Sequence, residues 1–173
     1  MNQPLAGMNA IVTGGGSGIG LACAMAFRKD GANILVMGRT ESKLETATQQ
    51  LLALPGEGQV QYFVGDAGEE ESVQQAVALA ADSGRLDIAI ANAGTGSLAP
   101  IEEIQDSEWQ RVLQTNLSGT FYLIKSAAAS MSGGGAICAI SSIAGVRTHR
   151  FMSAYCTSKA AVDMLVRNSA DEL

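Results

Sequence analysis

The feature that most constrains the fold is a regular alternation of short apolar runs with longer segments of helical periodicity. The apolar runs have the composition of strands that are buried on both faces, and they occupy residues 10–13, 34–37, 60–64, 86–91 and 136–140. Parallel neighbouring strands need long crossover connections, which helices usually provide. The alternation therefore predicts an α/β protein with a doubly wound parallel sheet and helices on both faces.

The predicted helices account for most of the chain between and beyond these strands. They cover residues 18–29, 41–54, 69–81, 101–114, 118–131 and 153–173. The last helix is still periodic where the sequence ends, whereas a doubly wound sheet usually continues into a further strand. We therefore expect a single domain over residues 1–173 that is incomplete at its C-terminus, in which either the strand at 136–140 is an apolar edge or the last helix covers no strand.

Composition excludes several classes of function. With 47% hydrophobic and 16% charged residues, the chain can form a core and is not a disordered tail. A net charge of −6 argues against a nucleic-acid partner, because such binding depends on basic contacts to phosphates. No apolar run reaches the roughly 18 residues of a membrane span, and no secretion signal begins the chain, so we expect a cytoplasmic protein with no membrane partner. Three scattered cysteines and one histidine show no metal-ligand spacing, which predicts that no metal is bound.

A glycine-rich loop joins the first predicted strand to the first helix. Residues 13–20 read TGGGSGIG, a spacing that differs from the G-x-G-x-x-G fingerprint. Glycines let backbone N–H groups approach a pyrophosphate, and the N-terminus of the following helix adds partial positive charge. An ordinary glycine-rich turn is the alternative. The candidate cofactor-binding residues in this loop are Gly14, Gly16, Ser17, Gly18, Ile19 and Gly20.

The end of the second predicted strand bears on the choice of cofactor. Units that bind NAD place a carboxylate here to bind the ribose hydroxyls, but residues 37–40 read MGRT and contain none. The planar guanidinium of Arg39 can instead pair with a 2′-phosphate. This favours NADP over NAD, although Arg39 could also be a solvated loop charge. Lys43 could assist, or it could equally face water.

Tyr155 and Lys159 are four residues apart on the last predicted helix, which places both side chains on one helix face. A phenol has an ordinary pKa of about 10, and a nearby ammonium lowers that value by stabilising the phenolate. Such a pair can exchange a proton with a carbonyl or carbinol oxygen. The spacing alone is weak, because it occurs by chance in many helices. It gains weight from polar residues after the fourth and fifth strands, Asn92 and the pair Ser141-Ser142, since ligands bind outside the carboxyl ends of such strands.

Taken together, these motifs resemble the short-chain dehydrogenase/reductase family. The resemblance extends from about residue 8 to the end of the chain and rests on motifs in the order and spacing of that family: Thr13-Gly14-x-x-x-Gly18-x-Gly20, Asp66, Asn92-Ala93-Gly94, Asn116, Ser142 and Tyr155-x-x-x-Lys159. It implies a Rossmann-like sheet with strand order 3-2-1-4-5, from which the family's usual last strands are missing in this sequence.

The resemblance also implies roles for individual residues. Tyr155 would be the general acid/base, and Lys159 would stabilise its phenolate and hold the nicotinamide ribose. Ser142 would orient the substrate oxygen, and Asn116 would anchor a water-linked proton relay. The other implied cofactor contacts are Asn92, Ala93 and Gly94 along the cofactor trough and Asp66 and Ala67 at the adenine. Considered singly, Asn92 and Asn116 could equally be capping or turn residues.

The expected function is therefore hydride transfer between NADP(H) and a small carbonyl or secondary alcohol substrate. Two alternatives remain: a catalytically impaired NADP-binding module, and a fragment that lacks the segment closing over the substrate. The resemblance also implies homodimers or homotetramers built on the predicted helices at 118–131 and 153–173. The substrate itself stays open, because the main substrate loop of the family would follow the last residue of this sequence.

Overall fold

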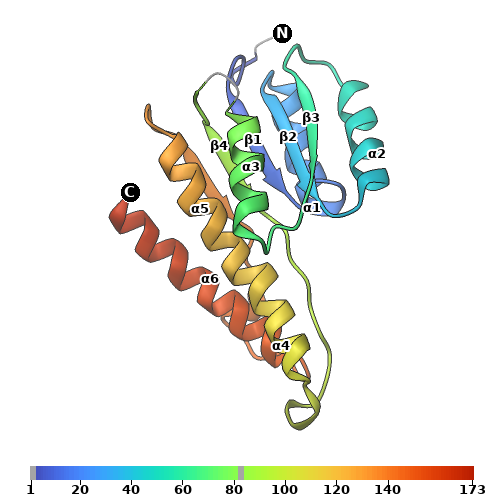
Figure 1. The fold of residues 1–173 in the computed structure, drawn as a ribbon, viewed down its shortest axis with the longest axis vertical. Coiled ribbons are helices and arrows are strands. Elements are labelled where there is room, and N and C mark those ends of the chain that lie inside the picture. The colour runs from blue at the N-terminus through green and yellow to red at the C-terminus, as the bar shows by residue number, and fades with distance from the viewer. Residues whose placement is uncertain (1–2, 82–83) are drawn as a thin grey trace.

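The computed structural model describes residues 3–81 and 84–173, and its framework is a five-stranded parallel sheet (Figure 1). The strands are β1 (Asn9–Thr13), β2 (Asn33–Gly38), β3 (Val60–Val64), β4 (Ile88–Ala91) and β5 (Ala136–Ala139). Their order is β3-β2-β1-β4-β5, and every neighbouring pair is parallel. The predicted α/β class, parallel sheet and strand order are thus confirmed.

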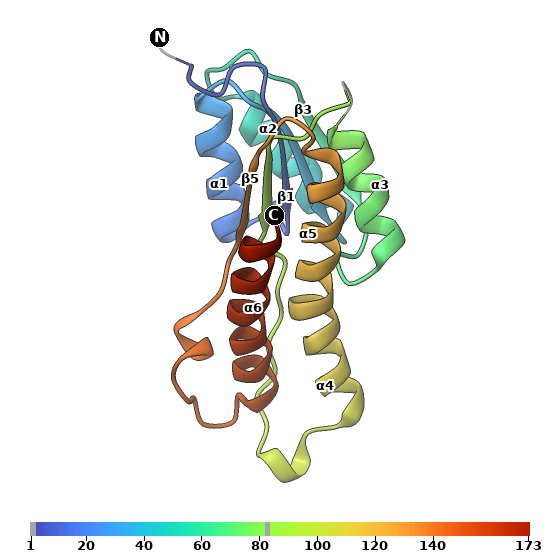
Figure 2. The same cartoon turned by 90° about the vertical axis from the view of Figure 1, so that its left-hand side faces the viewer.

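Helices cover both faces of this sheet. They are α1 (Gly18–Lys29), α2 (Glu41–Leu52), α3 (Glu70–Ala80), α4 (Asp106–Leu113), α5 (Gly119–Ser130) and α6 (Ser153–Glu172). Helices α1 and α2 pack against one face, and α3 and α5 pack against the other. Helix α6 runs beside α5 and α4, so the three form a layer that extends beyond the carboxyl ends of the strands (Figures 1 and 2).

The predicted division of residues 101–131 into helices is wrong in two places. The predicted helix at 101–114 is a short 3-10 turn, η1 (Ile101–Glu103), followed by α4, because Ile104 and Gln105 adopt extended backbone angles between them. The predicted break before residue 118 does not occur. A π-helical turn, η2 (Gln114–Ser118), instead joins α4 directly to α5. Asn116 therefore lies inside a continuous helical segment, and π turns of this kind are common at functional sites.

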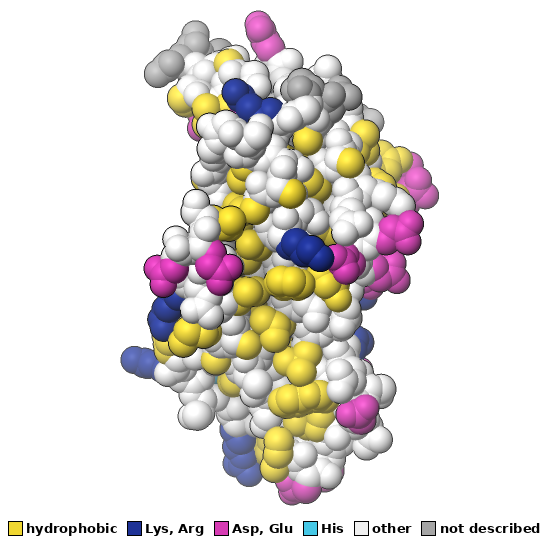
Figure 3. All heavy atoms as spheres, turned by 60° about the vertical axis from the view of Figure 1, so that its left-hand side comes forward, with side chains coloured by type: hydrophobic (Ala, Val, Ile, Leu, Met, Phe, Trp, Pro, Cys, Tyr) yellow, Lys and Arg dark blue, Asp and Glu magenta, His cyan; other side chains and the backbone are white. Residues whose placement is uncertain are grey.

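Strand β5 lies at one edge of the sheet and pairs with β4. A groove of about 300 Å³ runs between β5, α5 and α6, with a largely apolar lining that includes Ile124, Ile137 and Val166. Hydrophobic side chains also gather on the face of the molecule that Figure 3 shows. Phe121 of α5 and Met164 of α6 are exposed. In the part of the chain that the structure describes, no helix is both long and apolar enough to span a bilayer.

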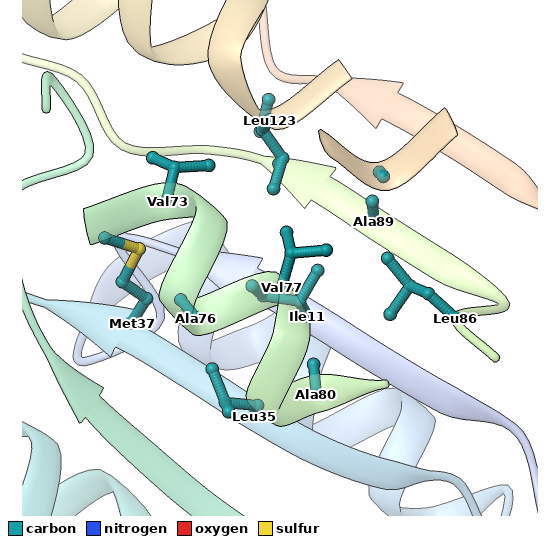
Figure 4. Close-up of a cluster of buried hydrophobic side chains, with 12 residues drawn as sticks. Ile11, Leu35, Met37, Val73, Ala76, Val77, Ala80, Leu86, Ala89 and Leu123 are labelled. Carbon is teal, nitrogen blue, oxygen red and sulfur yellow. The ribbon is translucent and has the colours of Figure 1, made fainter. Parts of the chain in front are cut away.

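The core consists of two apolar clusters, one on each face of the sheet. Side chains alternate between faces along a strand, so Ile11 of β1 points toward α3 and α5 while its neighbours Ala10 and Val12 point toward α1 and α2. Figure 4 shows Ile11 among Val77 of α3 and other buried side chains of the first cluster. Helices anchored in this way hold the loops at the carboxyl ends of the strands in fixed positions.

Candidate functional site

A cleft of about 160 Å³ lies at the carboxyl ends of the central strands. The loops that follow β1, β2, β3 and β4 all contribute to it, as expected where the crossover direction of a doubly wound sheet changes. Among the predicted cofactor residues, those that line the cleft are Gly14, Gly16, Ser17, Arg39, Asp66, Ala67, Ala93 and Gly94. Gly38, in the loop at residues 37–40, also lines the cleft. Sequence reasoning missed several further lining residues, namely Thr40, Leu44, Gly65 and Thr115, and had left the position of Lys43 open.

The loop between β1 and α1 has the form of a backbone cradle. Gly18 has a positive φ of 56°, and a Cβ placed on it would meet no atom within 4 Å, so its backbone borders open space. At Gly20, by contrast, a Cβ would lie only 2.5 Å from Asn92 Nδ2, so glycine is needed for close packing. The first turn of α1 contains no acidic residue. Its positive dipole is therefore available to an anion, and the loop fits the pyrophosphate of a dinucleotide.

Asn92 does not line the cleft but braces the loop that does. Its Nδ2 donates hydrogen bonds to the carbonyl oxygens of Thr13 (3.0 Å) and Gly14 (3.1 Å). In return, Thr13 Oγ1 accepts hydrogen bonds from the backbone N–H groups of Asn92 (3.1 Å) and Ala93 (3.2 Å). Thr13 thus locks the loops after β1 and β4 together. Its position at the end of β1 was visible in the sequence, but its role was not predicted.

Arg39 follows β2 and lies at the edge of the cleft with a side chain that is 60% exposed. Its Nη1 is 3.7 Å from Asp66 Oδ2 across the cleft. The other carboxylate oxygen of Asp66 accepts a hydrogen bond from the Gly68 backbone N–H (2.8 Å), which fixes the turn after β3. Because an exposed pair at this distance is weak, the guanidinium can exchange Asp66 for a stronger anion.

Asn116 is fully buried, and its amide group joins three elements. Its Oδ1 accepts a hydrogen bond from the Thr95 N–H (2.8 Å), and its Nδ2 donates to the Thr95 carbonyl oxygen (2.9 Å) and to Ser158 Oγ (2.9 Å). Ser158 Oγ in turn donates to the carbonyl oxygen of Tyr155 (2.7 Å). The π turn therefore links the loop after β4 to the first turns of α6, through Thr95 and Ser158, two residues that sequence reasoning missed.

Tyr155 and Lys159 lie on successive turns of α6, with Lys159 Nζ 5.9 Å from the centre of the tyrosine ring. Lys159 is only 5% exposed, and its Nζ donates a hydrogen bond to the Ile140 carbonyl oxygen (2.7 Å). Burial lowers the pKa of Lys159, whereas the carboxylate of Asp163 acts in the opposite direction. The ammonium is therefore held in a poorly hydrated position next to the phenol.

Ser142 lies beyond the end of β5, where it begins the 3-10 turn η3 (Ile143–Gly145). Its Oγ accepts a hydrogen bond from the Ala144 N–H (3.1 Å), and η3 packs against α6. The half-buried Ser142 hydroxyl keeps its own proton available for another acceptor, because the bond to Ala144 uses the oxygen only as an acceptor.

The loop after β4 connects the cleft to these groups on α6. A Cβ placed on Gly94 would lie 3.5 Å from Asn116 Oδ1 and 3.8 Å from Lys159 Nζ. A Cβ placed on Gly96 would lie 3.8 Å from Tyr155 Cδ2. Gly94 also lines the cleft, whereas Lys159 and Tyr155 do not, so the loop after β4 lies between the cleft and these two side chains. Within residues 3–81 and 84–173, no cluster of three His, Cys, Asp or Glu side chains could hold a metal ion.

Comparison with known proteins agrees with this architecture. The chain matches the short chain dehydrogenase family over residues 8–173. It is 38% identical over 173 residues to "Oxidoreductase asL5" of Sarocladium schorii, covering 99% of this chain and 68% of the relative. It is also 38% identical over 161 residues to a D-threitol dehydrogenase of Mycolicibacterium smegmatis, covering 91% of this chain and 61% of the relative.

A solved structure shows the same similarity in three dimensions. A short-chain type dehydrogenase/reductase from Mycobacterium ulcerans superimposes with a TM-score of 0.94 at 38% sequence identity, covering 98% of this chain and 63% of that one. This chain therefore spans between about three fifths and two thirds of the length of these relatives. The sequence match over nearly the whole chain and the shared fold show that it belongs to the short-chain dehydrogenase family.

Proposed function

We propose that the protein is an oxidoreductase that transfers a hydride between NADP(H) and a carbonyl or secondary alcohol substrate. The observation that carries this proposal is the placement of Gly94 and Gly96, which brings the cleft for a dinucleotide next to Lys159 and Tyr155. A dinucleotide site alone would indicate only binding. A phenol and a buried ammonium next to it add a group that can exchange a proton with substrate.

The residues of the cleft would hold the cofactor along its length. The loop at residues 14–20 and the N-terminus of α1 would bind the pyrophosphate, and Asp66 and Ala67 would contact the adenine. Ala93 and Gly94, braced by Asn92, would line the path toward the nicotinamide. When bound, the nicotinamide supplies or accepts the hydride.

Tyr155 would carry out the proton transfer. In the direction of reduction, its Oη donates a proton to the carbonyl oxygen of the substrate; in the direction of oxidation, the phenolate accepts the proton of the alcohol. Lys159 would stabilise the phenolate electrostatically and contact the nicotinamide ribose. The hydroxyl of Ser142 would donate a hydrogen bond to the substrate oxygen, and Asn116 would anchor the proton relay while bracing the loop after β4.

We propose NADP rather than NAD as the cofactor because Arg39 lies at the end of β2, where a carboxylate would select the ribose hydroxyls of NAD. Its exposed guanidinium and weak pairing with Asp66 support binding of a 2′-phosphate. Lys43 lines the same cleft and adds a second positive charge.

One experiment separates the enzyme from the impaired binding module. NADPH and NADH are titrated against the protein by fluorescence. Turnover is then measured with ketones and aldehydes in the presence of the reduced cofactors and with polyols in the presence of the oxidised cofactors, the polyols because one relative is a D-threitol dehydrogenase. We expect tighter binding of NADPH and oxidation or reduction of at least one substrate. Cofactor binding without turnover across the panel would favour the impaired module, and no binding of either cofactor would contradict both.

We also propose that the protein forms homodimers or homotetramers through α5 and α6. The exposed hydrophobic side chains Phe121 of α5 and Met164 of α6 support this arrangement. Light scattering on the wild type and on Phe121→Arg tests it: we expect an oligomer that the substitution dissociates. A monomeric wild type would contradict the proposal.

A further inference from the structure

We propose that Arg111 is a positioning residue that fixes the segment 94–96 against Tyr155 and Lys159. The inference rests on the proposed function of that site, and it assigns a role to a side chain outside the cleft. Arg111 is on α4, and sequence patterns give no reason to separate it from the other charged residues of that helix.

The guanidinium of Arg111 forms hydrogen bonds with two residues of the loop after β4. Its Nη1 donates a hydrogen bond to Thr95 Oγ1, and its Nη2 donates to the Gly96 carbonyl oxygen (3.0 Å). Two donors in a rigid plane fix both the position and the orientation of the acceptors. Arg111 thus constrains a side chain and the adjacent backbone at the same time.

Glu108, one turn earlier on α4, holds the guanidinium in place. Arg111 Nε and Nη2 donate to the two carboxylate oxygens of Glu108, at 3.0 and 2.8 Å. This hydrogen bonding lowers the pKa of Glu108, so the pair stays charged at neutral pH. The guanidinium therefore has a carboxylate on one edge and the loop on the other.

Asn116 also forms hydrogen bonds with Thr95, in this case with its backbone. Its side chain bonds both the N–H and the carbonyl oxygen of Thr95, while Arg111 bonds the hydroxyl. Beyond this point, the Ala99 N–H donates to the Phe151 carbonyl oxygen (3.0 Å). Thr95 is the only residue of the segment 94–96 with a side chain, so packing contributes little and these hydrogen bonds set its position.

The position of this segment matters because of what lies against it. Gly94 approaches Lys159 Nζ and Gly96 approaches the ring of Tyr155. A shift of about 1 Å in reacting groups can cost 100-fold in rate. Loss of Arg111 should therefore reduce turnover, while the adenine end of the cleft, formed by the loops after β2 and β3, stays intact.

The test compares Arg111→Met with the wild-type protein by hydrogen exchange and by steady-state kinetics. We expect amides in residues 93–99 to exchange at least tenfold faster, kcat to fall about 10- to 100-fold, and the Kd for NADPH to change less than threefold. Thr95→Val removes the hydroxyl that accepts a hydrogen bond from Arg111. It should also speed the hydrogen exchange of the amides in residues 93–99. It also serves as the second variant if Arg111→Met folds poorly.

Two controls separate positioning from a general loss of stability. Arg85→Met removes another arginine ion pair, with Asp87 (2.7 Å), at the opposite ends of the strands, and should leave exchange at 93–99 and kcat unchanged. Glu108→Gln weakens the support of the guanidinium but leaves Arg111 itself in place, and it should lower kcat less than Arg111→Met does. Arg111→Lys should restore only part of the loss, because an ammonium cannot reproduce the planar pair of donors.

Unchanged exchange at 93–99 in both Arg111→Met and Thr95→Val would overturn the proposal. So would an equal fall in kcat in Arg85→Met and Arg111→Met. If the wild type shows no turnover, the proposed function fails. The exchange measurement still decides the role of Arg111 in that case, because it needs no substrate.

Discussion

Lys159 Nζ donates a 2.7 Å hydrogen bond to the carbonyl oxygen of Ile140, which ties α6 to the residue that follows β5. This bond places a positive charge in a buried position at the end of the sheet, where it is 5% exposed. A buried ammonium is costly unless its interactions replace the lost hydration. The pKa of Lys159 is lowered by burial, so the interactions of its ammonium group replace the lost hydration only in part. The fold therefore accepts an unfavourable charge at the position where the proposed chemistry uses one.

The first prediction concerns the pH dependence of stability. Because the folded-state pKa of Lys159 is lowered, the unfolded chain binds more protons between that value and the ordinary lysine value of about 10.4. The free energy of unfolding of the wild type should therefore rise with pH across this window, relative to Lys159→Met. The relative gain is on the order of 1.4 kcal/mol for each unit by which the pKa is lowered. Urea denaturation of both proteins between pH 7 and 10 measures it.

Lys125 supplies a control of opposite sign. Its pKa is raised by its hydrogen bond to Glu70, so any stability it contributes is present below the ordinary lysine value and is lost at higher pH. Lys125→Met should therefore show no relative gain of the wild type between pH 7 and 10. The account of Lys159 is contradicted if its variant and the wild type respond identically to pH.

The second prediction concerns cofactor choice. If Arg39 pairs with the 2′-phosphate, Arg39→Ala should raise the Kd for NADPH about 10- to 100-fold, the range for loss of a charge-assisted hydrogen bond. The Kd for NADH should change less than threefold. Isothermal titration with both cofactors measures this, with the exposed Arg167 on α6 as the matched control in Arg167→Ala. Equal weakening of both cofactors would rule out the 2′-phosphate contact.

The third prediction concerns the contact between the loops after β1 and β4. Thr13→Val preserves the shape of the side chain but leaves the N–H groups of Asn92 and Ala93 without their shared acceptor. Thr13 is buried, so we expect the free energy of unfolding to fall by about 1–3 kcal/mol, with weaker NADPH binding. Thermal and urea unfolding measure the first effect. Thr46→Val, which removes an exposed hydroxyl bond within α2, should change stability by less than about 0.5 kcal/mol.

A similar loss of stability in both threonine variants would show that the Thr13 hydroxyl is not a special contact. A stability loss in Thr13→Val with unchanged NADPH affinity would show that the contact supports the fold but does not shape the cofactor cleft.

The arrangement of the sheet was predictable because it follows from periodicity. The apolar runs that form β1 and β2 are long enough to identify singly, and the crossover helices between them leave few possible topologies. The helical segment around Asn116 was not predictable in the same way. Residues such as Thr115, Ser118 and Gly119 are typical of a helix boundary, yet a π turn carries the helix through them.

The polar contacts of the site were predictable only where a motif marks them. Tyr155 and Lys159 share a helix face, so their spacing alone brings them together. Thr95, Ser158 and Arg111 act through partners that are distant in sequence, and a charged or hydroxyl side chain in a helix or loop is usually solvated. Nothing in the local pattern distinguishes them, because their role depends on which loop the fold places opposite them.

The measurement that tests the central claim most directly is turnover of Tyr155→Phe with the best substrate of the panel, using NADPH for a carbonyl substrate or NADP+ for an alcohol. Removing the phenolic hydroxyl should lower kcat/KM about 100- to 10,000-fold, the usual range for loss of a general acid/base. The Kd for NADPH should stay within about threefold, and Tyr122→Phe on α5 should behave as the wild type. Near-normal turnover of Tyr155→Phe would contradict the claim that Tyr155 transfers the proton.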